Sequence, residues 1–119
     1  DHVLNQSIGE EETFHEDIQS VNILIDKLKS YSINLSNKLI KKGYLVKTIT
    51  VKIKYDDFFI ETRSMTLNIP TNDHITIFTT SKHILLSKFK MEKKVRLIGL
   101  TLSNLIYPED PIQLSMKME

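Results

Sequence analysis

Polar side chains that can donate hydrogen bonds alternate with aliphatic ones along two segments of the chain, 45–55 and 93–105. Side chains at every second position of a β-strand share one face, so each segment predicts a strand with an aliphatic face and a polar face. Hydroxyl, ammonium and exposed amide groups are the donors that bind phosphate oxygens. The candidate donors on these two segments are Thr48, Thr50, Lys52, Lys54, Thr101 and Ser103.

Two further features bear on this polar face. Arg63 and Ser64 lie on the neighbouring segment, and one of the two is expected to face outward because they are adjacent. Arg96 has the parity of the aliphatic side and is expected to reach out past the edge of the sheet. No Phe or Tyr is clearly assigned to the polar face, so contact with a duplex backbone is favoured over stacking on bases.

The net charge of +1 conceals an uneven distribution along the chain. Residues 1–25 contain six acidic residues and no Lys or Arg, whereas residues 26–105 contain fifteen cations and six acids. This asymmetry indicates a polyanionic partner. The alternative is a Lys-rich surface that is simply solvated.

The hydrophobic spacing predicts four strands and two helices. The expected strands are 7–14, 45–55, 58–67 and 93–105, and the expected helices are 21–42 and 73–89. The order β-α-β-β-α-β predicts an α+β split βαβ sandwich with a four-stranded sheet. Right-handed crossovers would place both helices on one face and leave the other face open.

Some local features are predicted in more detail. Gly9 marks a bulge or a close approach in the first strand, and Gly43 is expected to end the first helix. A bulge is expected near 61–63, where the alternation is irregular. The inner face of the second helix is expected to comprise Ile75, Phe78, Lys82, Leu85 and Phe89.

Several classes of function are disfavoured by what the sequence contains. There are no cysteines, which excludes disulfides and thiolate metal sites and fits a reducing cytosol. No apolar run approaches the roughly 20 residues needed to span a bilayer. The four histidines are scattered, and Glu10, Glu11 and Glu12 point to alternating sides of a strand. Neither a metal site nor a catalytic site is therefore expected in this chain.

Four segments, SIGEEETF (7–14), TITVKIKYDDF (48–58), TRSMTL (62–67) and VRLIGLTLSNL (95–105), follow one another in register. Together they resemble the little finger domain of Y-family translesion DNA polymerases, of the bacterial DNA polymerase IV type. The resemblance implies a noncatalytic, cytoplasmic (nucleoid-associated) domain that holds primer-template duplex through phosphate contacts in the major groove. It further implies a DNA-directed DNA polymerase as the parent, which would need Mg²⁺, and no cofactor in this fragment.

The resemblance also implies boundaries and contact positions. Residues 1–6 would be the end of a linker, 7–106 the little finger domain and 107–119 a tail. The matching DNA-contact positions are Ser7, Gly9, Thr13, Arg63, Ser64, Arg96, Thr101 and Ser103. The chain departs from frequent cations at Gln6, Glu12 and Met65, which implies a weaker dependence of DNA binding on salt than in a more basic relative.

The tail segment PIQLSM, residues 111–116, resembles the short peptide by which bacterial polymerases bind the sliding clamp. Gln113 would supply the amide anchor, and Leu114 and Met116 the apolar contacts. Lys117 stands where the final aromatic residue is expected. Two other classes stay open: a small regulatory or dimerisation module of ferredoxin-like topology, and a small enzyme with an unrecognised site.

Overall fold

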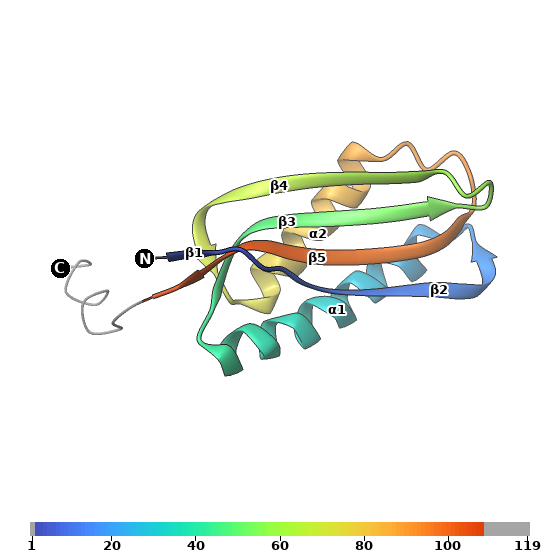
Figure 1. The fold of residues 1–119 in the computed structure, drawn as a ribbon. Coiled ribbons are helices and arrows are strands. Elements are labelled where there is room, and N and C mark those ends of the chain that lie inside the picture. Colours follow the sequence, from blue (N-terminus) through green and yellow to red (C-terminus); the bar gives the residue numbers. More distant parts are fainter. Residues whose placement is uncertain (1, 109–119) are drawn as a thin grey trace.

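Two helices lie on the same side of an antiparallel sheet in the computed structural model, which describes residues 2–108 (Figure 1). The α+β fold class and the order of the predicted elements are confirmed. The strands are β1 (His2–Leu4), β2 (Ile8–Ile18), β3 (Leu45–Tyr55), β4 (Ile60–Thr71) and β5 (Val95–Tyr107). The helices are α1 (Val21–Lys42) and α2 (His74–Lys88).

The sheet is four strands wide, in the order β2-β5-β3-β4, and all its neighbouring strands are antiparallel. The additional strand β1 pairs with the far end of β5, where Leu4 lies opposite Leu105. Residues 1–6 were expected to be the end of a linker, but residues 2–4 form this strand. Because β1 and β2 bind the same side of β5, they act as one interrupted edge strand.

The first helix buries one stripe of leucine side chains. Leu24, Leu28, Leu35 and Leu39 of α1 are fully buried against the aliphatic side chains of the sheet. Gly43 ends the helix with φ of 74°, and its N–H donates to the carbonyl of Ile40. This left-handed conformation favours glycine, because a Cβ atom would be strained there.

The predicted inner face of α2 was right for Leu85 and Phe89, which are buried, and wrong for Ile75 and Lys82, which are exposed. Ile75 was expected inside but is 61% exposed, and the buried residues are Ile77, Ser81, Ile84 and Leu85. Apolar residues occur on several sides of this helix, so their spacing did not define one stripe. The start of the helix is instead set by Asp73, whose carboxylate accepts hydrogen bonds from the backbone N–H and the hydroxyl of Thr76.

The predicted bulge near 61–63 was also misplaced. The pairing of β3 and β4 is regular from Ile60 to Thr66, and the register shifts between Thr66 and Thr71. This interval contains Pro70, which has no N–H to donate to a neighbouring strand. The irregularity therefore lies at the α2 end of β4.

In the described part of the chain, no helix is long and apolar enough to cross a membrane.

Replacement of Gly43 tests the helix end. Gly43→Ala is expected to lower the free energy of unfolding by about 1 kcal/mol, because it forces a Cβ atom into the left-handed region. Gly43→Asn should cost less, since Asn tolerates this conformation better. Urea denaturation measures both values, with the exposed Ile40→Ala as a control. Unchanged stability of Gly43→Ala would contradict the assigned helix end.

Candidate nucleic-acid interface

The sheet face that points away from the helices is built from alternate residues of four strands. Ile49, Val51 and Ile53 of β3 are fully buried on the helix side, so their sequence neighbours occupy the other side. The strand register aligns these neighbours in rows across the sheet. The open face is defined here by the rows Ser103–Thr48–Thr66, Gly9–Thr101–Thr50–Ser64, Glu11–Gly99–Lys52–Thr62 and Thr13–Leu97–Lys54–Ile60.

Hydroxyl groups dominate one half of the open face and are linked by hydrogen bonds. The hydroxyl oxygens of Thr50 and Ser64 lie 2.6 Å apart, and those of Thr48 and Thr66 lie 3.3 Å apart. Asn104 donates from Nδ2 to the Thr48 hydroxyl at 2.6 Å. These links orient the hydroxyls before any ligand arrives. The structure thus brings the predicted residues Thr48, Thr50, Ser64, Thr101 and Ser103 onto one surface.

The acidic edge strand partly neutralises the open face. Glu11 lies in the same row as Lys52, and its carboxylate is 3.2 Å from the Lys52 ammonium group. Glu10 and Glu12 face the helix side instead, where they contact Asn34 and Lys27. The alternation of β2 therefore separates these three consecutive acids, and of the three only Glu11 lies on the open face, where it would repel an anionic ligand.

Arg96 lies on the open face, contrary to the parity expectation. Val95 pairs with Tyr55, whereas Leu97 pairs with Lys54, so β5 carries one extra residue between these two pairs. Such a bulge resets the alternation, and Arg96 and Leu97 both lie opposite Lys54. The guanidinium carbon of Arg96 is 4.5 Å from the centre of the Phe58 ring.

Phe58 is one of the site residues that sequence reasoning missed. It lies in the turn between β3 and β4, is 60% exposed, and has a φ of 70°. The Lys54 ammonium group is 5.6 Å from its ring centre, so two open-face cations contact one aromatic ring. A positive φ at a bulky residue is strained, and such strain is often found where a side chain has a function. The sequence signal was an aromatic residue placed directly after the Asp56-Asp57 turn.

The same turn is attached to the start of β5. Asp57 accepts hydrogen bonds from the Lys93 ammonium group at 2.8 Å and from the Phe59 backbone N–H at 3.0 Å. The hydrogen bond from Lys93, followed by that from Phe59, lowers the pKa of the Asp57 carboxyl. Lys93 also lies 4.9 Å from the ring centre of Tyr55. These contacts fix the turn that presents Phe58.

Arg63 lies off the open face, on the helix side of β4. It pairs opposite Val51, forms an ion pair of 2.7 Å with Glu61 and lies 5.7 Å from the Phe89 ring centre. Glu61 also accepts a hydrogen bond from the Tyr55 hydroxyl. Burial, and then this hydrogen bond, raise the pKa of Tyr55. Of the adjacent pair Arg63 and Ser64, only Ser64 faces outward.

The site residues predicted for the first strand lie on β2 or just before it, at the edge of the open face. Gly9 and Thr13 occupy its rows, opposite Thr101 and Leu97. A Cβ atom on Gly9 would lie 3.0 Å from the Leu100 carbonyl oxygen, so the close approach expected at Gly9 is confirmed. Ser7 lines a shallow hollow of about 270 Å³ at this end of the face. The other lining residues of this hollow are Leu4, Asn5, Gln6, Ser103 and Asn104.

The predicted clamp-contact residues Gln113, Leu114 and Met116 lie outside the described residues. Within residues 2–108, no group of three or more His, Asp or Glu side chains is arranged to hold a metal ion. The side chains of the open face offer hydrogen-bond donation by hydroxyls, together with charge attraction by Lys52, Lys54 and Arg96.

Comparisons with known proteins agree with this architecture. Residues 5–116 match the impB/mucB/samB family C-terminal domain. The DNA polymerase IV of Listeria monocytogenes serotype 4a (strain HCC23) is 35% identical over 100 residues, covering 84% of this chain and 28% of that protein. The DNA polymerase IV of Desulfatibacillum aliphaticivorans is 35% identical over 103 residues, covering 87% of this chain and 26% of that protein.

Solved structures show the same fold. The little finger domain of PolIV, from a complex with the β-clamp processivity factor, has a TM-score of 0.67 and 23% identity, covering 88% of this chain and 93% of that one. DinB from Sulfolobus solfataricus has a TM-score of 0.69 and 21% identity, covering 86% of this chain and 29% of that one. The chain thus spans little more than a quarter of the curated relatives but nearly all of an isolated little finger. The chain belongs to the family of impB/mucB/samB C-terminal domains, and it has the little finger fold of Y-family DNA polymerases.

Proposed function

We propose that this chain is the noncatalytic DNA-gripping domain of a Y-family translesion polymerase of the DNA polymerase IV type. Its open face would lie along the major groove of primer-template duplex and contact the sugar-phosphate backbone. The observation that carries this proposal is the uncovered sheet face, on which rows of hydroxyls adjoin Lys52, Lys54 and Arg96.

The composition of the open face favours backbone contact over base reading. Hydroxyls and ammonium groups bind phosphate oxygens irrespective of the base sequence. Gly9 and Gly99 have no side chains, and the side chains of Thr101 and Glu11 lie against their backbones. Phe58 is an aromatic residue at this face, but Lys54 and Arg96 already lie against its ring, which leaves less of the ring for stacking on a base. We therefore expect binding that depends on salt and little on sequence.

The remaining functions belong to the proposed parent protein. Nucleotidyl transfer, and the Mg²⁺ that it needs, would reside in catalytic domains outside this chain. The domain would act in the cytoplasm, on nucleoid DNA. The tail residues Gln113, Leu114 and Met116 would bind the bacterial sliding clamp, which is supported by the related little finger that was solved with a β-clamp.

Charge reversal on the open face tests directly whether this face binds duplex DNA. Lys52→Glu together with Lys54→Glu is expected to abolish most of the binding of the 119-residue chain to duplex DNA, measured by fluorescence anisotropy. Each lost phosphate contact reduces the slope of log affinity against log salt by about 0.9. Lys29→Glu together with Lys82→Glu makes the same charge change on the helices and should have a small effect. Strong dimerisation without DNA binding would favour the regulatory module instead.

The Glu11–Lys52 ion pair predicts a variant that binds DNA more tightly. Glu11→Gln removes the negative charge from the open face and frees Lys52, so duplex affinity should rise about two- to five-fold at low salt. Glu10→Gln changes the net charge equally but lies on the helix side, where Glu10 contacts Asn34. Equal effects of the two variants in salt titrations would show that net charge, and not the open face, determines binding.

Phe58→Gly separates DNA binding from folding. Gly relieves the positive φ, while loss of the ring removes its contacts with Arg96 and Lys54. Relief of the positive φ should stabilise the fold by about 1 kcal/mol, and loss of the ring contacts should destabilise it by a similar amount. The free energy of unfolding should therefore change by less than about 1 kcal/mol. Duplex affinity should fall about two- to five-fold, because both cations lose their orientation. Unchanged affinity would contradict a role for this ring in positioning them.

A further inference from the structure

Most of the positive charge in the described chain lies away from the open face. The open face carries three cations, whereas α1 alone carries five lysines. Three of the five are Lys38, Lys41 and Lys42, whose spacing of three and four residues places them on one side of the helix. These three lysines are not used by the DNA contact proposed above.

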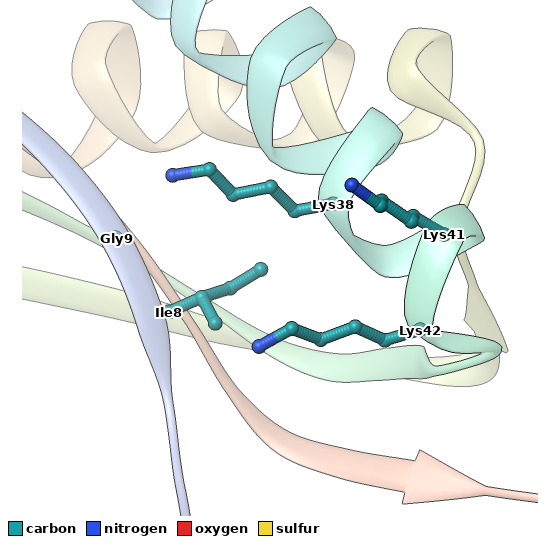
Figure 2. A pocket seen from close by; sticks show the side chains of 5 residues that line it. All are labelled: Ile8, Gly9, Lys38, Lys41 and Lys42. Carbon is teal, nitrogen blue, oxygen red and sulfur yellow. The ribbon is translucent and has the colours of Figure 1, made fainter.

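The three lysines line one hollow between the last turns of α1 and the start of β2, together with Ile8 and Gly9. The volume of this hollow is about 610 Å³. Figure 2 shows Lys38 and Lys42 extending from the helix toward β2, with the Ile8 side chain between them. None of the three lysines is ion-paired with a carboxylate among residues 2–108. Three ammonium groups therefore surround a space with no described counter-charge.

Stabilisation of the helix end explains this arrangement only in part. Lys41 and Lys42 lie in the last turn of α1, where cations interact favourably with the partial negative charge of the helix C-terminus. Lys38 lies before that turn, and like charges three and four residues apart repel one another. An anion bound in the hollow would neutralise this repulsion.

The hollow adjoins the open face at the edge of the sheet. In the described chain β2 pairs with β5 and has no strand on its outer side, so part of its backbone there is unpaired. Ile8 points to the helix side, and Gly9 belongs to an open-face row beside Thr101. A polyanion that crosses the open face at Gly9 and turns around β2 would meet the three lysines.

We propose that this hollow binds the phosphodiester backbone of single-stranded DNA that extends from the duplex on the open face, an inference that rests on the proposed function. A duplex is too stiff to turn around one strand edge, since its persistence length is about 50 nm. A single strand can make this turn. The flexible stems of the lysines let their ammonium groups follow its phosphates, while Ile8 provides an apolar contact for a sugar.

The test compares two DNA probes by fluorescence anisotropy: a blunt duplex, and the same duplex with a short single-stranded thymidine extension. The unaltered 119-residue chain should bind the extended probe more tightly. In the variant with Lys38→Gln, Lys41→Gln and Lys42→Gln, affinity for the extended probe should fall about 10-fold. Its salt slope should fall by about 0.7 for each lost contact. Affinity for the blunt duplex should stay within about two-fold.

A matched variant with Lys29→Gln, Lys82→Gln and Lys90→Gln removes the same charge elsewhere and should retain the preference for the extended probe. Circular dichroism melting identifies any variant that fails to fold, and single Lys38→Gln then replaces the triple variant. Equal losses on both probes, or no preference of the unaltered chain for the extension, would overturn this inference while leaving duplex binding intact. Failure of the unaltered chain to bind either probe would overturn the proposed function as well.

Discussion

Burial of one sheet face beneath two helices is the constraint on which the rest of this structure depends. Val51 and Ile53 of β3, and Leu100 of β5, have no exposed surface, and they pack with Leu28 and Leu35 of α1 in one core. Removal of such apolar surface from water is the main favourable term in folding. Because strand side chains alternate, this burial also fixes which residues face away. The polar surface is thus a direct consequence of the apolar core.

Positive charge on that polar surface is partly neutralised by the edge strand β2. Glu11 reaches the Lys52 ammonium group, while the acids on either side of Glu11 face α1. Both side chains of the Glu11–Lys52 pair keep a third or more of their surface exposed, so the pair contributes little to stability. In the proposed function, the effect of this pair is to lower the positive potential that an approaching phosphate would meet. A domain built this way would release DNA more readily than one whose edge strand carried cations.

One end of the open face is organised by a bulge and a tight turn acting together. The extra residue in β5 turns Arg96 toward the Phe58 ring, and Lys54 approaches the same ring from β3. The turn between β3 and β4 is held to the segment that connects α2 with β5, because the Lys93 ammonium group contacts Asp57. Two segments far apart in sequence therefore fix the orientation of one cation–aromatic cluster.

The sequence by itself determined the order of the elements, the α+β class and the members of the two faces of β3, because each depends on local periodicity. It also indicated the family, through four segments in register. Tertiary structure decided what local patterns leave open. Apolar residues on several sides of α2 allowed more than one inner face, and burial selected Ile77 in place of Ile75. The position of Arg96 depends on pairing between β3 and β5, and the Glu11–Lys52 contact depends on strand order. These are long-range pairings, whose register no single segment of the sequence specifies.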